Sequence, residues 1–187
     1  MEMHRASNLI ILDRDGVINQ DSDDYIKTPE EWIPIPGSLE AIARLNHAGY
    51  RVIVATNQSG LGCGYFNIDA TNAIHRKMQQ KLSVFGAQIE AIFLCPHTPD
   101  ANCRCLKPLP GLLEDIAKRL QIDMAGVPMI GDSLRDVQAA VTVGASPLLV
   151  LTGKGQSTVR EYTDDLVNVP IYKDLSAAAD ALLTGGC

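Results

Sequence analysis

Two aspartates that lie two residues apart, Asp13 and Asp15, directly follow an apolar run at residues 9–12. The run has the length and composition of a buried strand, and open α/β sheets bind their ligands at the carboxyl ends of such strands. Carboxylates placed this close together repel each other unless a proton or a cation lies between them. The pair therefore predicts a metal-assisted catalytic site at the end of a strand.

The Asp-x-Asp-Gly spacing also begins calcium-binding loops and ordinary turns, in which Gly16 would supply a positive φ angle. An EF-hand loop counted from Asp13 requires glycine at its sixth position and glutamate at its twelfth. The chain has Ile18 and Asp24 at these positions. The EF-hand is therefore disfavoured, whereas an ordinary turn explains this segment, taken alone, as well as catalysis does.

A second polar segment follows an apolar run at residues 52–55. Its members are Thr56, Asn57, Gln58, Ser59 and Gly60. A hydroxyl group beside backbone N–H groups at a strand end forms a cradle that suits phosphate oxygens. Helix capping or a turn is the alternative explanation for the same residue types.

A third segment has the pattern Gly131-Asp132-x-x-x-Asp136 and follows the apolar run at residues 127–130. Asp132 is predicted to join the first two aspartates around one hard cation, and Asp136, one helical turn later, to support the ligands of that cation. A helix cap with a carboxylate near the helix N-terminus is the alternative role. The two roles are compatible with each other.

Lys107 lies between the third predicted strand and a helix that begins near Gly111. An isolated lysine is ordinarily a solvated surface charge. At this point in the chain, however, its ammonium group is predicted to lie over the carboxyl edge of the sheet, where it would act as a point charge for phosphate.

The segment that follows the third predicted strand contains Cys95, His97, Cys103 and Cys105 in a C-x-H-x₅-C-x-C arrangement. Three thiolates and one imidazole complete a tetrahedral zinc shell that leaves no coordination position open, as in structural sites. We therefore predict a structural zinc in the loop at about 95–105, which has no core of its own. Buried cysteines beside a surface histidine are the alternative.

The other histidines, His4, His47 and His75, have no metal-ligand residues near them in the sequence, and we predict no metal-binding or catalytic role for them. The five cysteines are an odd number, and three of them crowd into one segment, which does not fit a disulfide framework. Cys63 and Cys187 are therefore predicted to be free thiols.

Short apolar runs rich in Val, Ile and Leu predict six strands, at residues 9–12, 52–55, 89–94, 127–130, 148–151 and 169–172. Their hydrophobicity is continuous, which is typical of parallel strands buried on both faces. Start and stop signals predict helices at residues 38–48, 69–85, 111–120, 134–143 and 174–183. The alternation predicts one α/β domain over residues 1–187, a doubly wound, Rossmann-like parallel sheet with helices on both faces.

The length of 187 residues suits a single α/β domain. The chain has 16 Lys and Arg against 22 Asp and Glu, a formal net charge of -6, and no basic tract, so nucleic acid is not an expected partner. No apolar stretch has the length of a secretory signal or of a membrane span. We therefore expect a cytoplasmic protein with no membrane partner. We also expect a monomer, although neither the charge nor the apolar pattern determines the oligomeric state.

In chain order, Asp13-x-Asp15-Gly16, Thr56, Lys107 and Gly131-Asp132-x-x-x-Asp136 resemble the four motifs of the haloacid dehalogenase-like phosphatases. The resemblance covers about residues 8–155 and includes the cysteine-rich loop. It implies a magnesium-dependent phosphomonoesterase. Because the insertions between the motifs are short, we expect a minimal cap over the active site.

The resemblance also implies a role for each motif residue. Asp13 would be the nucleophile that forms an aspartyl-phosphate, and Asp15 would be the general acid and base. Thr56 and Lys107 would stabilise the transferring phosphoryl group. The carboxylates of Asp13 and Asp132 and the backbone carbonyl of Asp15 would bind Mg²⁺.

The implied substrate is a small phosphorylated sugar, with the 7-phosphate of D-glycero-D-manno-heptose 1,7-bisphosphate as the leading candidate. Histidinol phosphate or another sugar phosphate is the alternative for the same mechanism. A silent module that only holds a phosphorylated ligand is a third interpretation. Asp15 disfavours that module, because binding alone does not require a second carboxylate beside the first.

The residues predicted to contact the substrate would line the entrance of the site. They are Asp21, Asp24, Asn57, Gln58, Ser59 and Leu106. Leu106 and Cys63 stand at positions where the family usually has arginine, which is the usual bidentate partner of a second phosphate group. Arg104 and Lys154 are candidate substitutes from nearby loops, with an exposed surface charge as the alternative for each.

Overall fold

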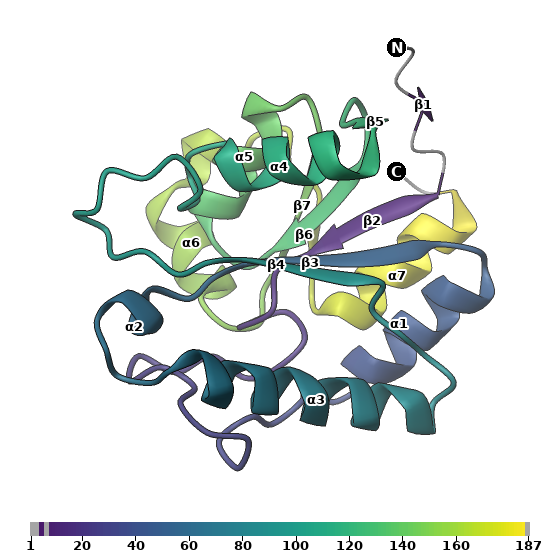
Figure 1. Ribbon diagram of the computed structural model, residues 1–187. Coiled ribbons are helices and arrows are strands. Elements are labelled where there is room, and N and C mark those ends of the chain that lie inside the picture. Colours follow the sequence, from purple (N-terminus) through teal and green to yellow (C-terminus); the bar gives the residue numbers. More distant parts are fainter. Residues whose placement is uncertain (1–3, 6–7, 186–187) are drawn as a thin grey trace.

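The computed structural model describes residues 4–5 and 8–185 (Figure 1). Its centre is a six-stranded parallel sheet with the strand order β4-β3-β2-β6-β7-β8. These strands are β2 (Leu9–Leu12), β3 (Arg51–Asn57), β4 (Ala91–Cys95), β6 (Pro128–Gly131), β7 (Ser146–Val150) and β8 (Ile171–Tyr172). From β2, the chain first adds β3 and β4 on one side of the sheet and then adds β6, β7 and β8 on the other side. The direction of strand addition therefore reverses between β2 and β6. In a doubly wound sheet, this is the point at which ligands bind.

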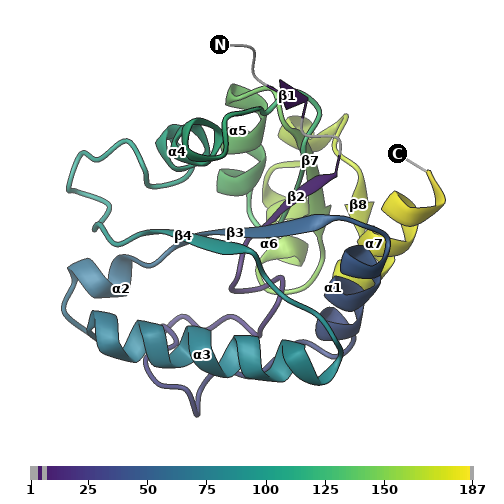
Figure 2. The same cartoon turned by 45° about the vertical axis from the view of Figure 1, so that its right-hand side comes forward.

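Helices cover both faces of the sheet (Figures 1 and 2). In Figure 1, α4 (Gly111–Leu120) and α5 (Leu134–Thr142) lie above the sheet, whereas α1 (Ser38–His47), α3 (Ile68–Val84) and α7 (Leu175–Thr184) lie below it. The shorter helical segments are α2 (Ser59–Gly62), α6 (Gly155–Glu161) and a 3-10 helix (Thr163–Leu166). Across residues 4–5 and 8–185, no helix combines the length and the apolar character that crossing a membrane requires.

The two hydrophobic layers follow from the alternation of side chains along the strands. In β2, Ile10 and Leu12 face the layer that contains α1, α3 and α7, whereas Leu9 and Ile11 face the layer that contains α4 and α5. All four side chains are at most 2 % exposed. A strand buried on both faces has no polar side, which explains why its sequence is continuously apolar.

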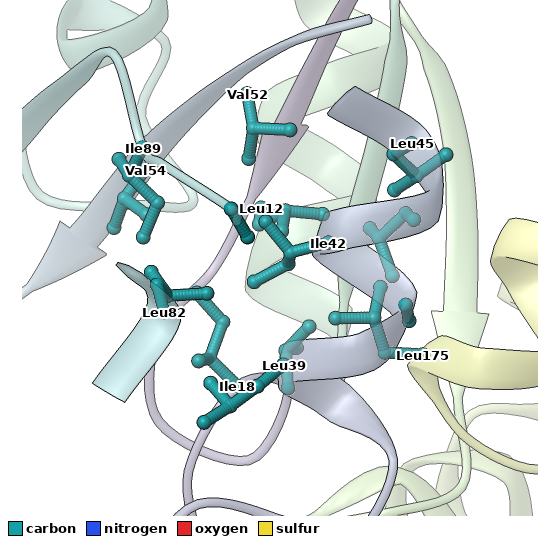
Figure 3. Close-up of a cluster of buried hydrophobic side chains, with 14 of the residues drawn as sticks. Leu12, Ile18, Leu39, Ile42, Leu45, Val52, Val54, Leu82, Ile89 and Leu175 are labelled. Carbon is teal, nitrogen blue, oxygen red and sulfur yellow. The ribbon is translucent and has the colours of Figure 1, made fainter. Parts of the chain in front are cut away.

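Figure 3 shows the layer on the α1 side of the sheet. Leu12 and Val54 of the sheet lie toward Ile42 of α1, Leu82 of α3 and Leu175 of α7. Fully burying an aliphatic side chain of this size contributes ~1.5–3 kcal/mol. This layer therefore fixes the sheet, and with it the loops that leave the carboxyl ends of the strands.

The predicted strands and helices are confirmed, with boundaries that differ by a few residues. The main difference is that β3 continues through Asn57, because Thr56 still pairs with Leu94 and Asn57 with Cys95 of β4. Thr56 and Asn57 therefore end a strand, whereas the sequence had placed them in the following loop. The helices α2 and α6, the 3-10 helix and a two-stranded pair of β1 (His4–Arg5) with β5 (Ile122–Asp123) were not predicted. The predictions for the side chain of His4 and the thiol of Cys187 lie outside the described part of the chain.

Candidate active site

A cavity of about 250 Å³ lies at the carboxyl edge of the sheet, where β2 adjoins β6. Four segments that are far apart in the sequence meet there, as their positions after the strands predicted. The lining residues named by the sequence motifs are Asp13, Asp15, Asp21, Thr56, Asn57, Gln58, Ser59, Lys107, Asp132 and Asp136.

The ammonium group of Lys107 lies between two carboxylates in this cavity. Its Nζ is 3.2 Å from Oδ1 of Asp13 and 2.6 Å from Oδ1 of Asp136, and it donates a hydrogen bond of 2.7 Å to the carbonyl of Ala55. Burial alone would lower the pKa of Lys107, but the two carboxylates outweigh that effect and raise the pKa above its ordinary value. Lys107 is therefore a fixed positive charge beside Asp13.

Asn57 fixes the backbone that carries this lysine. Its Nδ2 donates a hydrogen bond of 3.0 Å to the carbonyl of Lys107, and its Oδ1 accepts one of 3.1 Å from the backbone N–H of Lys107. The side chain of Asn57, which was predicted to contact the substrate, is thus already committed to holding the neighbouring loop against the end of β3.

Three carboxylates converge beside the lysine. Asp13, Asp132 and Asp136 each present one oxygen, and these oxygens all lie within 4.8 Å of one another. Burial raises the pKa of Asp13 to about 7 and that of Asp132 to about 8, and neighbouring carboxylates add to both shifts. Carboxylate oxygens are the ligands that Mg²⁺ and Ca²⁺ prefer. The residues present therefore fit a hard divalent cation.

Asp136 has a second role at the start of α5. Its Oδ2 accepts hydrogen bonds of 2.6 Å from Oγ of Ser133 and 3.1 Å from the backbone N–H of Ser133. The bond from the backbone N–H, together with the reciprocal contact between the backbone of Asp136 and the side chain of Ser133, forms a capping box. Burial would raise the pKa of Asp136, but Lys107 and Ser133 lower it. Asp136 therefore caps α5 with one oxygen and places the other in the carboxylate cluster, so the two roles considered for it from the sequence are compatible.

The side-chain carboxylate of Asp15 is not part of this cluster. Its Oδ1 accepts from Arg14 Nε at 3.0 Å and Asn19 Nδ2 at 2.8 Å, and its Oδ2 accepts from Arg14 Nη2 at 3.0 Å and Gln58 Nε2 at 2.9 Å. The same Gln58 amide donates a hydrogen bond of 2.9 Å to Oγ1 of Thr56. The two aspartates of the first motif therefore have separate surroundings: Asp13 is in the cluster, and Asp15 is held by neutral and cationic donors.

Two glycines allow the carboxylates to approach this closely. Gly16 has a φ of 81°, and a Cβ atom there would collide with Oδ2 of Asp132. A Cβ atom on Gly131 would collide with the side chain of Asp136. Any other residue at either position would displace a member of the cluster.

The entrance differs from the sequence predictions in its charged residues. Lys154 lines the cavity, and its Nζ lies 3.5 Å from Oδ2 of Asp21 and 3.6 Å from Oδ1 of Asp23. Arg104 instead pairs with Glu114 at 2.8 Å and is 77 % exposed. Among the described residues, the lining does not include Arg104, nor does it include Asp24 and Leu106, which were predicted to contact the substrate. The lining does include three residues that the sequence motifs did not indicate, Ser22, Tyr25 and Arg135.

The predicted zinc ligands form a second cluster at the end of β4. The Sγ atoms of Cys95, Cys103 and Cys105 and Nδ1 of His97 lie within 4.8 Å of one another. Sγ of Cys103 is 3.6 Å from each of the other two sulfurs, which are 2.8 Å apart, and His97 Nδ1 lies 3.6 Å from Cys95 and 3.2 Å from Cys105. Four ligands on a tetrahedron with metal–sulfur bonds of about 2.3 Å would be slightly under 4 Å apart. Three soft thiolates and one imidazole are a donor set that fits Zn²⁺, and the sulfurs of Cys95 and Cys105 lie closer together here than they would around a bound ion.

Comparison with known proteins supports the family resemblance seen in the sequence motifs. A profile of the HAD-hydrolase-like family matches residues 104–178. The D-glycero-beta-D-manno-heptose-1,7-bisphosphate 7-phosphatase of Bordetella bronchiseptica is 53% identical over 179 residues, which are 94% of this chain and 97% of that protein. The enzyme of the same name from Pseudomonas aeruginosa is 48% identical over 178 residues, which are 95% of this chain and 99% of that protein.

A solved structure of D,D-heptose 1,7-bisphosphate phosphatase from B. bronchiseptica, complexed with magnesium and phosphate, is similar to this fold with a TM-score of 0.90 and 52% identity. The matched region covers 95% of this chain and 99% of the chain in the solved structure. The resemblance to haloacid dehalogenase-like phosphatases is thereby confirmed. This chain belongs to the haloacid dehalogenase-like hydrolases, within the family of the D-glycero-beta-D-manno-heptose-1,7-bisphosphate 7-phosphatases.

Proposed function

We propose that this protein hydrolyses the 7-phosphate of D-glycero-D-manno-heptose 1,7-bisphosphate through an aspartyl-phosphate on Asp13. The observation that carries the proposal is the position of Asp13, whose carboxylate lies beside the ammonium group of Lys107 and within 4.8 Å of Asp132 and Asp136. A nucleophilic carboxylate, a fixed cation and a set of metal ligands are the parts that phosphoryl transfer to a protein requires. The names of its relatives support the substrate.

In the first step, a carboxylate oxygen of Asp13 attacks phosphorus, and the bond from phosphorus to the sugar oxygen breaks. Asp15 gives its proton to that oxygen as the sugar leaves. Lys107 and Thr56 stabilise the charge on the transferring phosphoryl oxygens, and both are buried, at 2 % and 1 % exposure, where such charges interact strongly.

In the second step, Asp15 takes a proton from water, and the water oxygen attacks the phosphorus of the aspartyl-phosphate. The bond from phosphorus to Asp13 breaks, and inorganic phosphate leaves. Asp15 is protonated again and Asp13 is ionised, so the site has returned to its starting state.

The carboxylates of Asp13 and Asp132 and the backbone carbonyl of Asp15 would hold Mg²⁺, with Asp136 supporting them from the start of α5. When bound, Mg²⁺ reduces the repulsion between an anionic nucleophile and an anionic phosphate. The raised pKa values of Asp13 and Asp132 support this assignment, because a cation would keep both groups ionised.

Lys154 and Arg135 are the cations that we propose for the second phosphate group. Both line the cavity and lie outside the buried cluster. The backbone N–H of Lys154 donates a hydrogen bond of 2.8 Å to Oδ2 of Asp132, which ties this loop to the catalytic residues. These two side chains would replace the arginines that the family usually has at the positions of Leu106 and Cys63.

Side-by-side turnover in Mg²⁺ tests the proposed substrate. The heptose 1,7-bisphosphate should give a higher kcat/KM than the heptose 7-phosphate or histidinol phosphate, and equal values would remove the substrate assignment. We expect Lys154→Met to lower kcat/KM about tenfold for the bisphosphate and little for the monophosphate, since one charge-assisted contact contributes ~1.5–3 kcal/mol. Arg104→Met is the matched control and should change neither value.

We also propose that Cys95, His97, Cys103 and Cys105 bind a structural Zn²⁺ that holds the loop before Lys107. Reduced thiolates are required for this site, which supports a cytoplasmic location. All of the residues assigned to the two sites belong to one chain, so a monomer would be sufficient for activity.

Replacing one zinc ligand should separate stability from catalysis. We expect Cys103→Ser to lower the zinc content and to destabilise the fold by at least ~2 kcal/mol, or roughly 5 °C in Tm for a chain of this size. Metal analysis and thermal unfolding measure both effects. Cys63→Ser is the control, because Cys63 is an exposed free thiol outside the cluster. Unchanged zinc content and Tm in Cys103→Ser would disprove the structural role.

A further inference from the structure

Arg14 is a buried cation that the mechanism above does not use. It lies between the two aspartates of the first motif, and none of its side chain is exposed. Arginine is almost never fully buried unless it is paired. Here the pairing is a fork: Nε and Nη2 donate to the two oxygens of Asp15, each at 3.0 Å. A fork fixes the plane of a carboxyl group as well as its position.

The third nitrogen of the guanidinium group reaches a different element. Nη1 of Arg14 is 3.3 Å from Nε2 of His75, which lies in the middle of α3. Because a guanidinium group only donates, Nε2 must accept, and the ring is then neutral with its proton on Nδ1. Burial, together with the charge of Arg14, lowers the pKa of His75 to about 4, which keeps the ring neutral at pH 7.

We propose that Arg14 and His75 are positioning residues for Asp15, through which helix α3 sets the direction in which Asp15 delivers its proton to the leaving sugar oxygen. This inference rests on the proposed phosphatase function. The other donors to Asp15 each bond one oxygen: Asn19 bonds Oδ1 and Gln58 bonds Oδ2. Arg14 alone bonds both oxygens, and His75 bonds the nitrogen of Arg14 that the fork does not use.

The proposal predicts an effect that depends on the leaving group. A sugar oxygen is a poor leaving group and needs the proton from Asp15, whereas p-nitrophenolate leaves readily without one. The parameter kcat/KM reports the reaction up to the first irreversible step, which is departure of the leaving group. Misalignment of Asp15 should therefore lower kcat/KM for the sugar phosphate selectively.

The experiment compares three substitutions on α3 in the full-length, Mg²⁺-loaded protein. His75→Leu removes the acceptor. We expect kcat/KM to fall about tenfold for the heptose bisphosphate, because part of a general-acid effect of ~10²–10⁴ is lost. For p-nitrophenyl phosphate we expect a fall of less than about twofold. His75→Gln offers an amide oxygen as acceptor and should recover most of the loss. Asn72 is an exposed residue one turn before His75, and both line a shallow surface pocket on α3. Asn72→Ala should leave kcat/KM unchanged for both substrates.

Arg14→Lys provides a second test that does not alter α3. One ammonium group cannot make the fork, so the same selective loss is expected, with an equal or larger size. Equal losses on both substrates, or no loss in a folded His75→Leu protein, would overturn the positioning role. Failure of the unsubstituted protein to hydrolyse either compound would instead refute the proposed function itself.

Discussion

Asp13→Asn should abolish turnover while leaving the fold intact. A carboxamide is nearly the same size as a carboxylate but does not form an acyl phosphate at neutral pH, so we expect kcat to fall by about 10⁴-fold or more. Burial raises the folded-state pKa of Asp13 to about 7, above its ordinary value of 3.8. An acidic group whose folded-state pKa is raised destabilises the folded state at every pH above its ordinary pKa. A neutral Asn should therefore leave the metal-free protein at least as stable as the unsubstituted protein at neutral pH.

Phosphate release and thermal unfolding, measured on the same preparations, check this result. The matched control is Asp165→Asn, an exposed aspartate in the 3-10 helix, which should change neither quantity. A module that only binds phosphorylated ligands would show no turnover in the unsubstituted protein and little change in ligand affinity on substitution. Substantial turnover by a well-folded Asp13→Asn protein would contradict the assignment of the nucleophile.

Lys107→Met should damage both stability and catalysis. The substitution keeps the length and flexibility of the side chain but leaves the buried carboxylates of Asp13 and Asp136 without their cation. Removing one partner of a buried ion pair costs ~3–5 kcal/mol, because the remaining charge is uncompensated. We also expect kcat/KM to fall by about 10²–10³-fold, the range for loss of one group that stabilises transition-state charge.

Chemical denaturation and phosphate release measure the two losses. Lys118→Met on the exposed surface of α4 is the control and should be close to the unsubstituted protein in both assays. Adding Mg²⁺ should recover part of the stability lost in Lys107→Met, because the metal would compensate the same carboxylates. A loss of stability below about 1 kcal/mol would show that Lys107 and Asp136 are not the buried pair described above.

The sequence predicted the parts of the site that lie at strand ends. Asp13, Thr56 and Asp132 each follow or end a buried apolar run, and parallel strands bring such positions to one edge. Lys107 was predicted to lie over that edge from its place in the chain. Its burial, at 2 % exposure, was not predictable, because it depends on Asn57 and Asp136 from two other elements.

The position of His75 beside Arg14 could not be predicted from the sequence, which indicated no metal-binding or catalytic role for this residue. His75 and Arg14 are 61 positions apart, and only the packing of α3 beside the loop after β2 brings them together. No local pattern indicates such a contact, since a histidine in an amphipathic helix is ordinarily a core or surface residue. Arg135 and Lys154 were hard to assign for a related reason. Arg135 reaches the cavity from α5, and Lys154 reaches it from the loop before α6. The helix α6 has too little hydrophobic periodicity to be predicted.

Identification of the residue that carries the phosphoryl group tests the central claim most directly. The protein is mixed with heptose 1,7-bisphosphate and Mg²⁺, quenched in acid within the first turnover, digested and analysed by mass spectrometry. We expect one acid-stable, hydroxylamine-labile phosphoryl group on the peptide that contains Asp13, and none in Asp13→Asn. A phosphoryl group on another residue, or rapid release of phosphate with no labelled peptide at any time, would contradict the proposed mechanism.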